Sequence, residues 1–101
     1  MHFIQILLPL RDNDDRKFPQ EHYEEVTREL TNEFGGVTSF VRSPAVGIWR
    51  GSSANHHDDM LLFEVLADQL DEEWWANYKK KLKKVFRQEE VLIWASTVTK
   101  L

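Results

Sequence analysis

The chain has 101 residues, of which 42% are hydrophobic, and it carries a formal net charge of −4 without a cysteine. The negative charge disfavours nucleic acid and anionic membranes as main partners, because both attract an excess of positive charge. The lack of cysteine excludes disulfides, thiolate metal ligands and thiol nucleophiles. No apolar run approaches the ~20 residues of a membrane helix, and no secretory signal pattern is visible. We therefore expect one globular domain over residues 1–101, located in the cytoplasm.

The first part of the chain is predicted to fold as strand, helix and strand. Residues 3–10 are apolar on both faces of an alternating pattern apart from Gln5 and a proline, which is typical of a strand buried on both sides. Residues 19–34 repeat apolar side chains at the spacing of one helical face, and Gly35 follows as a left-handed cap. Residues 37–42 alternate again and predict a second strand.

The second part of the chain repeats this order after a polar loop. Residues 60–66 are an apolar run with one charge, Glu64, near its centre, and they predict another buried strand. Residues 71–87 carry a stripe of aromatic and aliphatic side chains at helical spacing. Residues 91–98 alternate as a final strand, so the same unit occurs twice.

Two strand–helix–strand units in one short chain predict a split β-α-β sandwich of the α+β class. Its four-stranded antiparallel sheet would carry both helices on one face. The opposite face would present mostly apolar side chains, namely Phe3, Gln5, Leu7, Met60, Leu62, Glu64, Leu92 and Trp94. Such a patch would exceed the roughly 300 to 600 Å² that monomers commonly expose, so we expect a homodimer. Pairing through sheet faces is the simplest arrangement, and pairing through edge strands is the alternative.

This element order and the apolar open sheet resemble the dimeric α+β barrel superfamily, whose ferredoxin-like units join their sheets around a shared cavity. The resemblance covers nearly the whole chain, and the corner at 34–38, the pair Trp74 and Trp75, and the junction at 86–90 look like fixed features of an uncharacterised branch. The superfamily includes cofactor-free monooxygenases, haem-degrading enzymes, muconolactone isomerase-like proteins and stress-induced barrels, so it implies no single function. Its haem-degrading members use a helical histidine as the iron ligand, and residues 71–87 contain none. We therefore expect no cofactor.

Glu64 is the strongest candidate for a catalytic residue. A carboxylate that is desolvated in the middle of a strand becomes a stronger base, and beside Gln5 and Trp94 it could accept a proton from a substrate. The alternative is a structural carboxylate paired with Arg42 or Arg50, since buried charges are usually paired. An arginine partner would leave no room for a substrate at Glu64.

The substrate-binding residues expected around Glu64 are Gln5, Phe40, Trp75, Trp94 and Ser96. The glutamine and the serine would provide hydrogen bonds, and the aromatic rings would form apolar walls. Because Trp74 and Trp75 lie about 100° apart on a helix, both cannot face the core. The alternative to ligand stacking is that these tryptophan rings pack in the core or at an interface.

Two further clusters have an ordinary explanation. The side chains of His56, His57, Asp58 and Asp59 are of types that bind metals. Side chains of adjacent residues in an extended segment point in opposite directions, however, so we expect a surface loop without a metal. Six basic residues within 79–87 complement the negative end of the second helix dipole. Anion binding at that helix end is the alternative.

These features favour a homodimer that binds a small, largely apolar organic molecule at the open sheet face. Oxidation or isomerisation without a cofactor is the enzymatic form of this hypothesis, and the residues do not decide whether the protein is an enzyme. The alternative is a non-enzymatic domain whose open face is consumed by dimerisation. In the dimer, a closed cavity near Glu64 larger than about 300 Å³ would favour ligand binding, whereas a fully packed seam would favour the structural role.

Overall fold

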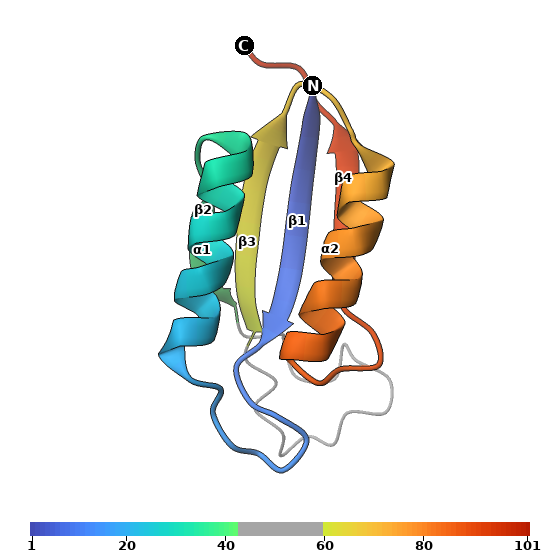
Figure 1. Cartoon of the computed structure of the whole chain (residues 1–101). Helices are drawn as coiled ribbons and strands as arrows, with labels where there is room; N and C mark the ends of the chain where they lie inside the picture. The colour runs from blue at the N-terminus through green and yellow to red at the C-terminus, as the bar shows by residue number, and fades with distance from the viewer. Residues whose placement is uncertain (43–59) are drawn as a thin grey trace, which may run out of the picture.

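The computed structural model describes residues 1–42 and 60–101, with only the backbone of residues 40–42. Its elements follow in two strand–helix–strand units (Figure 1): β1 (His2–Pro9), α1 (Gln20–Phe34), β2 (Thr38–Arg42), β3 (Met60–Ala67), α2 (Glu72–Val85) and β4 (Leu92–Thr97). The predicted order of strands and helices is confirmed, with ends that shift by one or two residues. The polar loop predicted between the two units lies outside the described residues.

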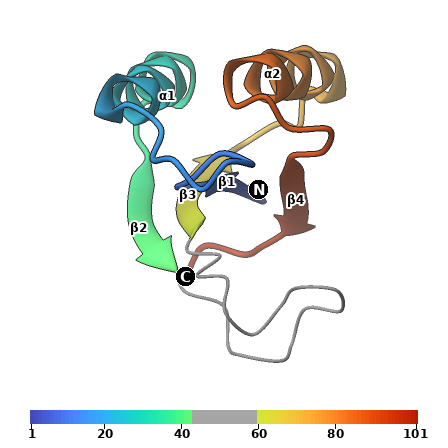
Figure 2. The same ribbon diagram turned by 90° about the horizontal axis from the view of Figure 1, so that it is seen from below.

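The strands form one antiparallel sheet in the order β2-β3-β1-β4. The longest strands, β1 and β3, have 8 residues each and take the two interior positions. Both helices lie on the same face of this sheet (Figure 2), with α1 on the side of β2 and α2 on the side of β4. The predicted α+β class is confirmed, and the topology is consistent with a ferredoxin-like fold.

Local signals set the ends of both helices. Gly35 ends α1 with a φ of 82°, and its N–H donates to the Thr31 carbonyl at 2.8 Å, as glycine caps commonly do. Asp71 precedes α2 and accepts a hydrogen bond from the Trp74 N–H at 3.0 Å. The helix ends at Val85, before the predicted end, because Arg87 adopts a φ of 50° that is incompatible with a continuing helix.

The core fills the space between the helices and the face of the sheet that they cover. Alternate β1 residues supply Ile4, Ile6 and Leu8, each 0% exposed. The helices bury the predicted stripes, which comprise Tyr23, Val26, Leu30, Trp75, Tyr78 and Leu82. The Tyr23 hydroxyl donates to the Pro9 carbonyl at 2.6 Å, and burial raises the pKa of Tyr23 to about 12. This hydrogen bond ties the start of α1 to the end of β1.

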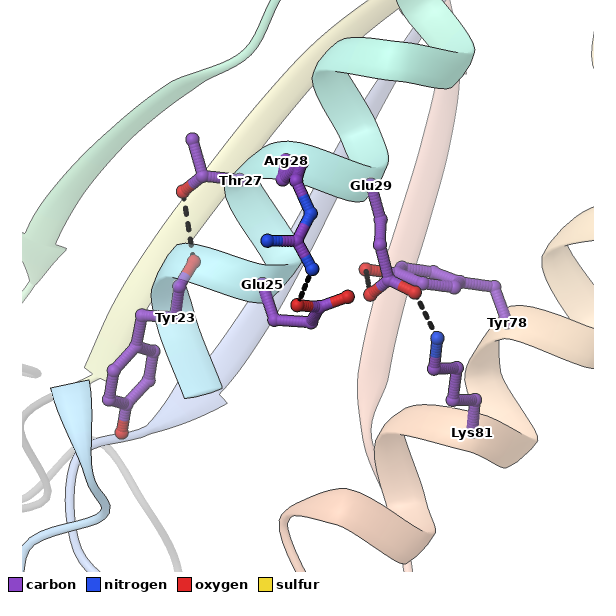
Figure 3. Close-up of polar contacts among 7 residues, drawn as sticks. All are labelled: Tyr23, Glu25, Thr27, Arg28, Glu29, Tyr78 and Lys81. Atoms are coloured by element: carbon purple, nitrogen blue, oxygen red, sulfur yellow. Dashed lines mark hydrogen bonds and ion pairs between the residues drawn. The ribbon is translucent and has the colours of Figure 1, made fainter. Parts of the chain in front are cut away.

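A polar bridge joins α1 to α2 (Figure 3). The Tyr78 hydroxyl donates to Glu29 Oε1 at 3.3 Å, and Lys81 forms an ion pair with the same carboxylate. Burial and the negative charge of Glu29 raise the pKa of Tyr78, because both disfavour the phenolate. Two residues of α2 therefore converge on one carboxylate of α1, which helps to fix how the helices lie beside each other.

Candidate functional site

The face of the sheet that carries no helix is the candidate functional site, and we call it the open face. Strand register aligns one residue from each strand across it: Thr38 of β2, Glu64 of β3, Gln5 of β1 and Trp94 of β4. We call these four residues the central row. Paired residues of antiparallel strands project to the same face with Cβ atoms about 5 Å apart. The row therefore crosses the open face from one edge strand to the other.

Glu64 is hydrogen-bonded within this row. Gln5 Nε2 donates to Glu64 Oε2 at 2.9 Å, and both side chains are half-buried. A carboxylate can accept about four hydrogen bonds, so among the described residues this bond uses a fraction of its capacity. The Gln5 carbonyl oxygen adds a further acceptor. The pair is consequently suited to a molecule that carries hydrogen-bond donors.

The predicted arginine partners of Glu64 do not enter this geometry. Arg42 belongs to β2, but its side chain is not among those described, and Arg50 lies outside the described residues. The cross-strand partner that the structure assigns to Glu64 is the neutral amide of Gln5. The catalytic role of Glu64 stays a prediction.

Apolar side chains surround the central row, and they differ strongly in exposure. Leu66 and Trp94 are 50% and 55% exposed, whereas Leu62 is only 1% exposed. The expectation that Leu62 forms part of an exposed patch is therefore wrong. Leu66 extends beyond the β2 pairing and Trp94 belongs to an edge strand, which accounts for their exposure, whereas an interior strand alone does not account for the burial of Leu62, because Leu7 and Glu64 occupy such strands and are half-buried. The exposed apolar surface is thus concentrated at one end of β3 and on β4.

The other predicted binding residues are divided between the open face and the helix layer. Ser96 is exposed and pairs with Phe3, two positions along β4 from Trp94, so it shares the open face. The backbone of Phe40 pairs with Leu62, which places it at an open-face position of the register. Trp75 lies on α2 and points into the helix-covered core, so the structure does not bring it to Glu64.

Trp75 belongs instead to an aromatic cluster between the two helices. Its ring stacks on Phe34 of α1 with centroids 5.3 Å apart and meets Trp74 edge-on at 4.8 Å. Trp74 in turn stacks on Tyr78 at 4.8 Å. Trp75 is buried in the core and Trp74 packs half-buried against its margin, so one of the two rings lies fully in the core.

The structure also forms a groove that the sequence did not reveal, between α2 and the β4 edge of the sheet. Its volume is about 250 Å³. Trp75, Ala76 and Lys79 line it from α2, and Ile4, Ile93 and Ala95 line it from the strands. This groove lies on the helix-covered side of the sheet, so it is separate from the open face. No periodicity in the sequence predicts this groove, because its lining comes from β1, α2 and β4, which are far apart in the chain.

Half of the six basic residues in 79–87, at and just beyond the end of α2, form ion pairs. Three of these cations contact carboxylates: Lys79 with Glu90, Lys81 with Glu29, and Arg87 with Asp12. These contacts favour a structural role over anion binding. Across the two described ranges, no cluster of three metal-ligating side chains occurs, and no helix combines the length and apolar character needed to cross a membrane. The predicted loop with His56 and His57 lies outside those ranges.

Comparison with known proteins gives a likeness at the level of fold. No protein-family model and no curated protein matches the sequence. Among solved structures, a phage SAM lyase in complex with S-methyl-5'-thioadenosine is similar, with a TM-score of 0.62 and 14% sequence identity. The likeness covers 94% of this chain and 79% of the phage enzyme. At this identity the likeness establishes a shared fold and no shared activity.

Proposed function

We propose that the open face binds a small organic molecule that combines a flat apolar ring with hydrogen-bond donors, and that a second copy of the chain closes the site. The observation that carries this proposal is the Gln5–Glu64 hydrogen bond of 2.9 Å on an otherwise mostly apolar sheet face, next to Trp94. The polar pair would accept the donors of the ligand. The Trp94 ring, 55% exposed, would stack on its apolar ring.

We propose that a second copy of the chain packs on the open face, because apolar side chains at one end of β3 and on β4 are exposed there and would be buried by it. Burying the remaining half of Leu66 and of Trp94 would remove on the order of 200 Å² of mostly apolar surface per chain from water. The twofold symmetry of a homodimer would double this gain and would place two central rows opposite each other. A ligand between them would contact both sheets.

The structurally similar phage enzyme suggests a ligand with which to begin. Its bound molecule, S-methyl-5'-thioadenosine, has a flat adenine ring, an exocyclic amine and a ribose diol. These groups match the stacking surface and the acceptors proposed for the open face. If the protein is an enzyme, Glu64 is the residue that we propose as the proton acceptor, without a cofactor.

Isothermal titration calorimetry with S-methyl-5'-thioadenosine tests this proposal. We expect saturable binding that Glu64→Gln weakens by about 10- to 100-fold, because a charge-assisted hydrogen bond contributes about 1.5 to 3 kcal/mol. Trp94→Leu should weaken binding as well, since it removes the stacking surface. Glu33→Gln is the matched control, because it makes the same substitution at an exposed position of α1 and should leave the affinity unchanged.

The outcomes separate the hypotheses. Binding that depends on Glu64 and Trp94 supports the proposal. Absence of binding up to about 5 mM contradicts it, since a ligand held by stacking and two hydrogen bonds should bind more tightly than that. A stable dimer that binds nothing would instead favour the non-enzymatic domain whose open face serves only for association.

A further inference from the structure

β4 is an edge strand that is covered on neither of its faces near its end. It pairs with β1 on one side, and no other strand of the described residues pairs with its second edge. Its last four residues, Trp94, Ala95, Ser96 and Thr97, are all exposed although their side chains alternate between the two faces. Ala95 and Thr97 lie on the helix-covered side, so the function proposed for the open face does not account for their exposure.

The backbone of β4 directs alternate residues to this outer edge. The Val98 N–H donates to the Met1 carbonyl at 2.9 Å, and these two residues continue the register of β1 and β4 by one pair. Because hydrogen-bonded and non-hydrogen-bonded pairs alternate along an antiparallel ladder, residues 92, 94 and 96 also bond to β1. The N–H and C=O groups of the three residues between and after them therefore point outward, namely those of Ile93, Ala95 and Thr97.

The outer edge of β4 lacks the features by which proteins prevent edge strands from pairing. Such features are charged side chains, prolines, bulges and very short strands. The six residues of β4, Leu92–Thr97, include no charge and no proline, and their register with β1 is uninterrupted. The other edge strand, β2, is shorter, with 5 residues, and ends in the charged Arg42. A further strand is therefore expected to pair at β4.

The outward groups of β4 are complementary to those of a second β4. Around a twofold axis at Ala95, two antiparallel β4 strands place Ala95 opposite Ala95 of the second copy, and Ile93 opposite its Thr97. Each of the three outward residues then meets an outward residue of the other strand, so that their N–H and C=O groups pair. The side chains on this part of the contact are uncharged, so the pairing brings no like charges together.

The α2 helices add complementary charges to this contact. Glu72, Ala76 and Lys79 of α2 lie beside Ala95 of β4. Each helix covers two of the four strands, about 10 Å of sheet, so joining two β4 edges sets the two α2 helices about 10 Å apart, as in packed helices (Figure 2). The twofold axis makes them antiparallel, so Glu72 of one copy faces Lys79 of the other. Lys79 pairs with Glu90 of its own chain and has two further N–H donors.

We propose that β4 pairs edge to edge with β4 of a second copy and joins the two sheets into one continuous sheet. This contact goes beyond the function proposed above and does not depend on it, because it uses the strand edge and the helix layer. It also places Ser96 of the second copy opposite Trp94 on the open face, since the residues one position to either side of Ala95 pair with each other. The partner thereby adds a hydroxyl beside the Trp94 ring.

Cross-linking through one introduced cysteine tests the register directly, because the chain has no cysteine of its own. Opposite residues of a hydrogen-bonded pair have Cα atoms about 5.5 Å apart, which a disulfide can bridge. We expect Ala95→Cys to form a covalent dimer under mild oxidation at least ten times faster than Thr97→Cys. The two Thr97 residues would lie about 14 Å apart, too far for a disulfide. Equal rates for the two variants would overturn the proposal.

A proline at the same position tests the backbone pairing. Ala95→Pro removes an outward N–H and no bond to β1, so the fold should persist, which the NMR amide spectrum checks. Ala95→Val is the matched control, because valine has as many side-chain carbons as proline and keeps the N–H. We expect the dimer dissociation constant from sedimentation equilibrium to be at least 10-fold higher for Ala95→Pro than for Ala95→Val.

The outcomes are decisive in either case. Equal dissociation constants in the folded proline and valine variants would contradict edge pairing between copies, as would a chain that associates only with strands of other proteins. If Ala95→Pro does not fold, the cross-linking rates of Ala95→Cys and Thr97→Cys decide. The side chains of both positions lie on the helix-covered side of the sheet. Failure here would therefore leave the contact through the open face unaffected.

Discussion

Leu66→Ala should weaken the proposed homodimer. Leu66 is 50% exposed on the open face, and fully burying a leucine side chain contributes about 1.5 to 3 kcal/mol. The exposed half therefore represents about 1 kcal/mol per chain, and twofold symmetry doubles it to about 2 kcal/mol per dimer. We expect the dimer dissociation constant to rise by about 30-fold, because about 1.4 kcal/mol corresponds to a factor of ten.

Sedimentation equilibrium over a range of protein concentrations measures this change. Val85→Ala is the matched control, because Val85 is an exposed apolar residue of α2, 37% exposed, and lies on the helix layer away from the open face. A wild-type chain that stays monomeric at high concentration would refute the reasoning. Equal effects of Leu66→Ala and Val85→Ala would also refute it, because they would place the contact elsewhere.

Two further predictions concern the stability of the fold. Burial raises the pKa of Tyr23 from 10.0 to about 12 in the folded state. The protonated Tyr23 hydroxyl therefore contributes fully to the free energy of unfolding below pH 10, and this contribution is lost as the pH rises from 10 to 12. Urea unfolding should show that the wild type loses about 2 kcal/mol more than Tyr23→Phe over this interval. A pH dependence unaltered by Tyr23→Phe would contradict this cause. Gly35→Ala should lower the unfolding free energy by about 1 kcal/mol, because Gly35 has a φ of 82°. Gly36→Ala is the control and should change the unfolding free energy by less than about 0.5 kcal/mol. The φ of Gly36 is not left-handed, and no atom lies within 4 Å of an added Cβ. Equal losses in both variants would show that the left-handed cap is not the cause.

Much of the fold could be predicted because its local signals agree with its tertiary structure. The alternation in residues 3–10 reappears as buried Ile4, Ile6 and Leu8 on one face and half-buried residues on the other. Gly35 ends α1 and Asp71 caps α2 as their residue types indicate. Alternation also puts Gln5, Glu64 and Trp94 on the same face, whereas the register that aligns them in one row, and the place of Thr38 in it, come from the structure.

What the sequence could not predict depends on distances between residues far apart in the chain. The ring of Trp75 is held by Phe34 of the other helix, and no local pattern indicates that partner. The groove beside β4 is lined by residues of β1, α2 and β4, and no local pattern indicates that these residues meet. The burial of Leu62 could not be predicted either, because Leu7 and Glu64 lie on the same face of the interior strands and are only half-buried.

The central claim is that the open faces of two chains enclose a small-molecule ligand. The thermodynamic linkage between ligand binding and dimerisation tests this claim most directly. Sedimentation equilibrium of the wild-type chain should be measured with and without S-methyl-5'-thioadenosine. If the ligand binds between two sheets, each bound molecule at about ten times its Kd should tighten the dimer by about tenfold, since a ligand that binds one state stabilises it by mass action. A dimer constant that stays the same while the ligand binds would place the ligand outside the interface and contradict the account.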